Sequence, residues 1–419
     1  MASYPAQSDV APAPQDAAAA APDALKPPPG NPRFPLFDGL RAIAACTVLI
    51  THCAGITAFN TANPLGAYTA RLDLGVTIFF LISGFLLYRP FVAARVEGKP
   101  PIHVGRFFRR RALRIIPAYW VALTLLSIWP GLDGFSAHPL RYYTFTQIYW
   151  LDSTTKGIGP AWTLCVEVSF YLVLPLLAAL IARLARGRAH WVRIELGVLA
   201  VLTLACLVLR SALQAAGGFS PLQNTLLCFF DWFAYGMALA VLSVAWHRRE
   251  SQSRTLVTII RRPWLPWAGA IVVFWVVSTQ LGLSRGFFFV FTNFNYQAEH
   301  LGYALIAFLL LLPAVFGDWA GGWPRRLLKL RWMAWLGLIS YGIYLYQVPL
   351  IVWLRVHLQP SVLGMPFPTL VVLAFAVTVL FAAGSYYVVE RPMLRFKDPR
   401  GPARRRAPSP EGSAPASAG

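Results

Sequence analysis

Acidic residues and cysteines are both scarce in this 419-residue chain. Only 17 aspartates and glutamates stand against 37 lysines and arginines, and charged residues of both signs make up 13% of the sequence. The five cysteines form no C-x-x-C pair, and no histidine lies at metal-ligand spacing. We therefore predict neither a disulfide framework nor a metal site, and no permanently bound cofactor.

The N-terminus lacks the apolar core of a signal peptide. Residues 1–33 are rich in Ala and Pro, and residues 398–419 are rich in Pro, Arg, Ser and Ala. Both compositions are typical of disordered, uncleaved segments. The predicted organisation is a tail over 1–33, one membrane domain over 34–397 and a basic tail over 398–419.

Hydrophobic sequence is abundant, at 57% of all residues. A helix needs about 20 apolar residues to cross the hydrocarbon, and somewhat fewer when it is shielded by its neighbours. The chain thus predicts an all-α, polytopic bundle of about ten spans. They lie at 36–56, 74–92, 113–128, 162–181, 194–213, 226–244, 264–281, 301–315, 332–353 and 370–389.

The basic residues indicate how the bundle is oriented. Thirty-one of the 37 lie in, or at the span ends next to, the two terminal segments and alternate gaps, and only six belong to the other gaps. By the positive-inside rule both termini are cytoplasmic. Charge confined to one side of a bundle also argues against nucleic acid as a partner, despite a net charge of +20. The excess of arginine over lysine, with abundant Ala and Pro, is typical of a GC-rich bacterial genome, so we predict a bacterial inner-membrane protein.

Ionisable residues within the spans are few, and His52 and Glu167 stand out. Such groups are costly in hydrocarbon, so they usually face a cavity or a partner. Arg41 and His52 are eleven residues apart, which places them within about 20° on one helix face and about 16 Å apart along the axis. Asp38 lies within about 40° of the same stripe.

Three polar side chains from different spans are predicted at similar depth. His52 is about 21 Å from the inner surface, and Gln347 is about 22 Å along the ninth span from Trp332. Glu167 is about 7 to 8 Å below the outer boundary. This level is a candidate reaction centre. A plainer interpretation also exists, in which His52 hydrogen-bonds a neighbouring carbonyl and Glu167 forms an interhelical hydrogen bond.

Six short motifs, in chain order over residues 36–396, resemble the membrane acyltransferase-3 family. Each motif is weak alone, but six in one order are specific. They are Phe37-Asp38-Gly39-Leu40-Arg41 running to His52, Phe79-Phe80-Leu81-Ile82-Ser83-Gly84-Phe85, Arg110-Arg111-Ala112-Leu113-Arg114, Trp162-Thr163-Leu164-Cys165-Val166-Glu167 with Phe170 and Tyr171, Ser340-Tyr341-Gly342-Ile343-Tyr344-Leu345, and Glu390-Arg391-Pro392.

The resemblance implies an O-acyltransferase that moves a short acyl group, such as acetyl or succinyl, from cytoplasmic acyl-CoA as co-substrate. The acceptor would be a hydroxyl of a sugar, glycolipid, cell-envelope polymer or secondary metabolite. The family's R-x10-H pair matches Arg41 and His52, and its R-x-x-R element matches Arg111 and Arg114. Where the family often has a second histidine, this chain has Gln347, which cannot accept a proton at neutral pH. The chain resembles the stand-alone form, without a fused esterase-like domain.

Acyl transfer to an alcohol needs a base, and imidazole suits this role near pH 7. We therefore expect His52 to be the general base, with a covalent acyl-imidazole as a less favoured variant. Glu167 would orient the imidazole or bind the acceptor. The predicted phosphate-binding arginines are Arg41, Arg110, Arg111 and Arg114, although this basic cluster could equally be only a topology signal. The remaining predicted substrate-binding residues are Asp38, Trp162, Tyr171, Tyr341, Tyr344 and Gln347, of which the last three are candidate oxyanion donors.

Two other classes of function remain open from the sequence. A transporter or flippase of a lipid-linked sugar or small molecule would also keep intramembrane charges. The chain shows no inverted internal repeat of the kind that transporter folds often carry. A scaffold without chemistry is less favoured, because it has no reason to retain a buried histidine and glutamate. Membrane lipids are partners in every case.

Overall fold

The computed structural model describes residues 34–217, 220–247, 257–258, 261–286, 292–316, 321–358 and 366–397. Within these ranges the chain forms helices and turns and contains no strand. The predicted disordered tails, 1–33 and 398–419, lie outside the described residues. The long helices are α1 (Phe37–Ile56), α4 (Gly75–Val96), α5 (Val104–Ile128), α7 (Trp162–Ala185), α8 (Trp191–Ala215), α9 (Leu226–His247), α11 (Trp264–Thr279), α12 (Asn293–Val315), α15 (Ser340–His357) and α16 (Phe367–Ser385).

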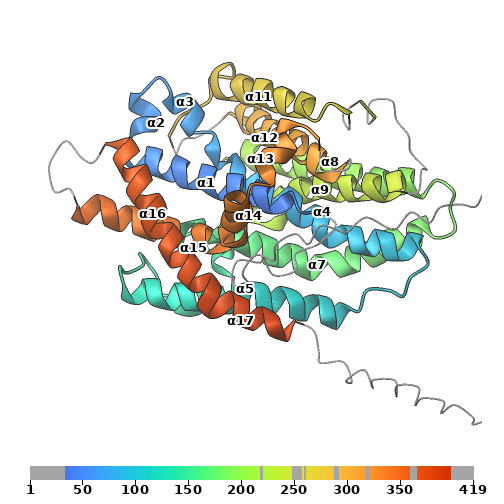
Figure 1. Cartoon of the computed structure of the whole chain (residues 1–419), viewed down its shortest axis with the longest axis horizontal. Helices are drawn as coiled ribbons and strands as arrows, with labels where there is room; N and C mark the ends of the chain where they lie inside the picture. The colour runs from blue at the N-terminus through green and yellow to red at the C-terminus, as the bar shows by residue number, and fades with distance from the viewer. Residues whose placement is uncertain are drawn as a thin grey trace, which may run out of the picture.

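Shorter elements connect these helices. They are α2 (Phe59–Ala62), α3 (Gly66–Thr69), α6 (Pro139–Tyr143), α13 (Trp323–Leu328), α14 (Arg331–Leu338), α17 (Arg391–Met393), the 3₁₀ turns Leu72–Leu74, Gln147–Tyr149, Gly159–Ala161, Pro221–Asn224 and Leu394–Phe396, and a π-helical turn at Tyr386–Glu390. Figure 1 shows the long helices running roughly side by side, with α16 crossing them obliquely.

The prediction of a polytopic helical membrane bundle is confirmed. Eight segments of the described chain are long and apolar enough to span a membrane. A ninth candidate is the pair α14 and α15, and the shorter apolar helix α11 occupies the position of the seventh predicted span. Each of the ten predicted hydrophobic segments therefore coincides with an apolar helix or helix pair.

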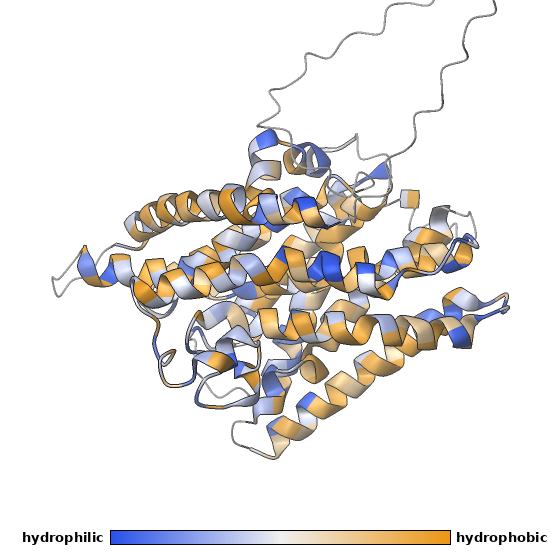
Figure 2. Ribbon diagram, turned by 90° about the horizontal axis from the view of Figure 1, so that it is seen from below, coloured by the Kyte–Doolittle hydropathy of each residue, from blue (hydrophilic) through white to orange (hydrophobic). Residues whose placement is uncertain are grey.

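The outer faces of the bundle carry apolar stripes. On α7, Leu172, Leu176 and Leu180 recur every four residues and are more than half exposed, as are Val201 and Leu204 on α8. Figure 2 shows apolar residues along much of the long helices and many polar residues near helix ends and in the connecting turns. Large exposed apolar surfaces mark contact with a membrane or another protein. Stripes on several long helices fit a surrounding lipid phase.

Helix α4 lies at the centre, where it packs against α1, α7, α9 and α12. Its contact with α9 depends on two glycines. A Cβ atom at Gly84 would lie 2.2 Å from the Phe233 carbonyl oxygen, and one at Gly236 would lie 2.1 Å from the Leu81 carbonyl oxygen. Small residues let membrane helices approach closely. This close approach holds the phenylalanine-rich face of α4 in a fixed position within the bundle.

The predicted ninth span is not one straight helix. It divides at Ile339 into α14 and α15, which are bent by 68° relative to each other. The Ser340 hydroxyl donates to the Gly337 carbonyl at 2.8 Å, which satisfies an acceptor at the end of α14. Gly337 also packs directly on the backbone of Asp38 in α1. The expected depth of about 22 Å for Gln347 assumed one continuous helix from Trp332. The bend shows that this assumption was wrong.

Gly236→Ala is expected to destabilise the fold by about 1–3 kcal/mol, because the new methyl group would overlap a backbone oxygen that cannot rotate away. Gly197→Ala on α8 is the matched control, since its Cβ would meet no atom within 4 Å. Thermal unfolding of the two purified variants would measure the difference. Equal midpoints for both would contradict the role assigned to the α4–α9 contact.

Candidate active site

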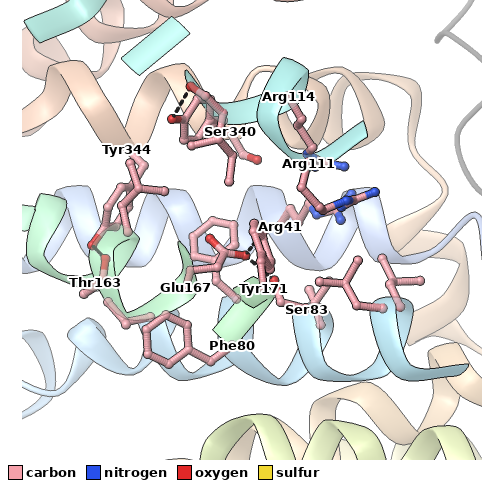
Figure 3. A pocket seen from close by; sticks show the side chains of 18 residues that line it. Arg41, Phe80, Ser83, Arg111, Arg114, Thr163, Glu167, Tyr171, Ser340 and Tyr344 are labelled. Carbon is pink, nitrogen blue, oxygen red and sulfur yellow. Dashed lines mark hydrogen bonds between the residues drawn. The ribbon is translucent and has the colours of Figure 1, made fainter. Parts of the chain in front are cut away.

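A cavity lies between α1, α4, α5, α7 and α15. Figure 3 shows its labelled side chains converging from these helices, with arginines toward one end and Thr163 and Tyr344 toward the other. Of the residues predicted from sequence, the cavity brings together Arg41, Arg111, Arg114, Glu167, Tyr171, Tyr341 and Tyr344. Its apolar walls come mainly from α4 and include Phe79, Phe80 and Leu86. Seven of the predicted site residues thus share one internal space.

Three guanidinium groups form the basic end of this cavity. Arg111 and Arg114 are three residues apart on α5, so they project from the same side toward Arg41 on α1. Both lie close enough to Arg41 for their charges to act on it. Asp38 forms an ion pair with Arg41, at 3.0 Å between Oδ1 and Nη1. Like charges held together in a low dielectric repel strongly, which makes this end suited to an anion.

The predicted residue Arg110 has a different position. It is exposed and is not part of the cavity wall. The physical reason is helical geometry, because Arg110 and Arg111 are about 100° apart on α5. The structure also extends α5 back to Val104, so the whole basic cluster belongs to a helix. Position on that helix, and not the cluster itself, decides which arginines reach the cavity.

Glu167 lies in the middle of the cavity. Its Oε1 atom accepts hydrogen bonds from the Ser83 hydroxyl of α4 and from the Tyr171 hydroxyl, the latter at 2.6 Å. Tyr171 is one turn further along α7, and it also faces Arg111. These contacts link the carboxylate to the basic end through a tyrosine. They hold the carboxylate in a fixed orientation within the cavity.

The far end of the cavity is closed by hydroxyl groups. The Tyr344 hydroxyl donates to the Pro160 carbonyl at 3.0 Å and lies 2.6 Å from the Thr163 hydroxyl. The Phe79 ring packs edge-on against Tyr344, with ring centroids 6.0 Å apart. Tyr341, also predicted as an oxyanion donor, donates to the Ile115 carbonyl at 3.1 Å. Both tyrosine hydroxyl protons are therefore already used by backbone carbonyls in this structure.

His52 shares α1 with Arg41 but is not among the residues that line the cavity. Its Nδ1 atom lies 2.8 Å from the Val48 carbonyl oxygen. A carbonyl can only accept, so Nδ1 carries the proton in this contact and Nε2 has the basic lone pair. The imidazole is thus oriented by its own helix. Glu167 was one candidate to orient this ring, but the hydrogen bonds described for Glu167 go to Ser83 and Tyr171.

Gln347 lies beside His52. It is fully buried, and neither its amide nitrogen nor its amide oxygen has a hydrogen-bond partner of normal geometry. The side chain is nevertheless close enough to influence the His52 ring, so the two are neighbours across the α1–α15 contact. An unsatisfied buried amide costs free energy. Its position next to the candidate base suits a site that binds a polar ligand.

Trp162 is the remaining predicted site residue. It begins α7, and its ring packs against Phe229 at 5.2 Å between centroids and does not line the cavity. Three polar lining residues were not predicted, namely Ser83, Thr163 and Ser340. Each lies inside one of the motifs quoted above, so the motifs contained a signal for them. Hydroxyl groups are common in membrane helices, and that signal could not be separated from ordinary packing.

The expectation that few ionisable groups lie within the bundle was incomplete. Arg210 on α8 forms an ion pair with Asp231 on α9 at 2.9 Å, and His300 on α12 contacts both residues. All three side chains are at least 97% buried. His300 lies one residue before the predicted span 301–315, whereas the helix itself begins at Asn293. Arg210 lies within the predicted span 194–213 but was considered only as part of the charge bias. His300 is therefore a second embedded histidine, and it lies next to a cation.

A second buried network joins α12 to the segment before α4. Arg71 pairs with Glu299, and the Tyr303 hydroxyl lies 2.6 Å from the Asp73 carboxylate and 3.0 Å from that of Glu299. A third pairs Arg95 of α4 with Glu195 of α8, to which Tyr88 also donates. Every acid in these networks has a cation or a hydroxyl as partner, so their arrangement is that of interhelical connections.

Comparison with known proteins identifies the class of this bundle. A family model described as an acyltransferase domain matches residues 35–387. The chain therefore belongs to this membrane acyltransferase family, and the resemblance inferred from its motifs is confirmed. No solved structure matches it significantly.

Three relatives illustrate the family. The chain is 26% identical to a putative peptidoglycan O-acetyltransferase of Bacillus subtilis, with 86% of this chain and 55% of the relative covered. It is 26% identical to nodulation protein 10 of Rhizobium leguminosarum, with 86% and 93% covered. It is 22% identical to the peptidoglycan O-acetyltransferase OatA of Listeria monocytogenes, with 86% and 55% covered. The chain thus spans about half the length of two of these relatives and most of the third.

Asp231→Asn is expected to destabilise the protein by about 3 kcal/mol or more, because it leaves the buried Arg210 charge without its counter-ion. Asp152→Asn is the matched control, since it also removes a carboxylate from an arginine pair, with Arg141, but its side chain is 60% exposed. Thermal unfolding of both purified variants checks this. A loss of the same size in Asp152→Asn would show that burial is not the cause.

Proposed function

We propose that this protein transfers a short acyl group, such as acetyl, from acyl-CoA to a hydroxyl of a carbohydrate, with His52 as general base. The single observation that carries the proposal is the cavity, in which three arginines lie at one end and Thr163 and Tyr344 lie at the other. Membership of an acyltransferase family supports the reaction class. The relatives named as peptidoglycan O-acetyltransferases favour a glycan acceptor and acetyl as the group transferred.

The basic end fits the phosphates of coenzyme A. Guanidinium groups bind phosphate oxygens through pairs of parallel hydrogen bonds, and Arg41, Arg111 and Arg114 present three of them. Asp38 is the ion-pair partner of Arg41, so it would set the orientation of that arginine and not contact an anion directly. By the positive-inside rule this end of the cavity faces the cytoplasm, where acyl-CoA is made.

The acyl end of the donor would then extend toward Tyr344. Tyr344 lines the cavity, and Gln347 lies three residues further on α15, beside His52. Coenzyme A is a long molecule with its phosphates and its thioester well separated. A site with cations at one end and a base beyond the other end fits that shape.

The reaction itself requires one base and one oxyanion donor. The acceptor oxygen bonds to the thioester carbonyl carbon while its proton moves to His52 Nε2. The carbon–sulfur bond then breaks, and the leaving thiolate takes up the proton from the imidazolium. Gln347 is the best placed donor to the transient oxyanion, because its amide protons have no other partner of normal geometry. Glu167 would bind an acceptor or donor hydroxyl together with Ser83 and Tyr171.

His52→Gln is expected to lower kcat by about 10²–10⁴-fold, because glutamine keeps hydrogen-bonding capacity but cannot accept a proton. His138→Ala, which removes an exposed histidine in the described loop after α5, is the control and should retain full activity. Product formation from acetyl-CoA and a glycan acceptor would be followed by mass spectrometry on protein in nanodiscs. Wild-type kcat in folded His52→Gln would remove the base assignment.

Arg111→Ala is expected to raise KM for acetyl-CoA by about tenfold or more and to change kcat less, because its partner is a charged part of the donor remote from the reacting carbon. Arg109→Ala removes an arginine of the same cluster that is exposed and outside the cavity. Steady-state kinetics with varied acetyl-CoA separates the two. If both variants raise KM equally, the cluster acts only through its overall charge.

A further inference from the structure

A second cavity lies at the opposite end of the same helices. It is formed by the turn after α5, the turn before α7 and the C-terminal part of α15 from Val348 to His357. The C-terminus of α5, the N-terminus of α7 and the C-terminus of α15 all belong to the end that carries few basic residues. By the positive-inside rule this end faces outward. We call this space the outer cavity and the first one the inner cavity.

The walls of the outer cavity are held together by the fold. The Gly157 N–H donates to the Asp133 carbonyl at 2.9 Å, which joins the two turns. The Trp129 ring packs against Trp353 of α15, with ring centroids 5.0 Å apart. The two turns and the end of α15 therefore form one connected wall, and the cavity is a preformed feature of the bundle.

The lining combines an aromatic surface with polar groups of both signs. Trp353 stacks with His357 at 4.9 Å and 19° between ring planes, and both residues line the space. Asp133, Thr155 and Lys156 line the opposite side and are exposed. A carboxylate, a hydroxyl and an ammonium together offer acceptors and donors, with little net charge. Such a set suits neutral hydroxyl groups better than an anion.

The outer and inner cavities are lined by residues that lie next to one another. Gly159 lines the outer cavity, and the next residue, Pro160, accepts the hydrogen bond from Tyr344, which lines the inner cavity. On α15, Val348 lines the outer cavity and follows Gln347 directly. Gln347 is the neighbour of His52. The candidate base therefore lies beside the part of the bundle that separates the two spaces.

We propose that the outer cavity binds the carbohydrate part of the acceptor, with a sugar ring against Trp353 and its hydroxyls on Asp133, Lys156 and His357. The inference rests on the proposed acyl transfer and extends it by giving the acceptor its own site, opposite the donor. Sugar rings have apolar C–H faces and polar edges, which match an aromatic surface with mixed polar groups around it. Donor and acceptor then approach His52 from opposite sides of the membrane.

A lipid chain is the main competing occupant, because Val352 and Val356 also line the outer cavity and are 45% and 62% exposed. A chain alone would leave Asp133, Thr155 and Lys156 without a role. The cavity also lies where the helices end, so water would contact one side of a bound ligand. These features favour a sugar at this position.

The test uses full-length protein in nanodiscs and a tetramer of N-acetylglucosamine as a neutral glycan probe, with binding measured by calorimetry. Trp353→Ala is expected to raise Kd for the probe about tenfold, and Trp353→Phe should restore most of the affinity because an aromatic face remains. Lys156→Ala should weaken binding severalfold. Trp150→Ala is the control, since that ring is 49% exposed and lies outside both cavities.

Binding of acetyl-CoA is measured in the same variants and should not change. Probe affinity that is unaffected by Trp353→Ala and Lys156→Ala, or wild-type protein that does not bind the probe, would overturn the inference. Displacement of the probe by decanol would assign the cavity to a lipid chain and would also overturn it. If the probe binds as expected but no acyl transfer occurs, the proposed function fails while the glycan site remains.

Discussion

The need to stabilise buried charge governs much of this structure. In a low-dielectric bundle an ionised side chain has to find a counter-charge, a hydrogen-bond partner or a ligand. Most buried acids described here meet that need within the protein, as Asp231 does with Arg210 and Glu195 does with Arg95. The inner cavity differs, because Arg41, Arg111 and Arg114 meet there with Asp38 as the one ion-pair partner described. An anion at that position would supply the missing negative charge.

Close helix packing places the other polar groups around this centre. Gly84 and Gly236 let α4 and α9 touch backbone to backbone, which fixes Ser83 and the phenylalanines of α4 at the cavity wall. Gly337 lets α14 pack on α1, and the chain then turns by 68° into α15. That turn brings Ser340, Tyr341 and Tyr344 to the inner cavity and Gln347 to His52. The broken span is therefore what joins the inner cavity to the candidate base.

The two cavities suggest how such a bundle could work across a membrane. The inner cavity is basic at the end predicted to face the cytoplasm, and the outer cavity is aromatic and mixed in charge at the other end. Tyr344 and Thr163 close the inner cavity through the Pro160 carbonyl, next to the Gly159 wall of the outer one. A reaction at this wall would need no passage of the whole donor through the bundle. It would need only the acyl group to reach His52.

The sequence by itself determined the membrane fold, its helical segments and the family, because these depend on local hydrophobicity, charge bias and short motifs. It also predicted seven residues of the inner cavity, because these residues are ionisable groups within the spans or belong to the short motifs of the family. Only the tertiary structure decided that Arg110 faces away, that Trp162 packs on Phe229, and that His52 lies outside the cavity lining beside Gln347. It alone revealed the Arg210–Asp231–His300 cluster and the outer cavity. The physical reason is that these features depend on which faces of distant helices meet, and periodicity along one helix does not specify its neighbours.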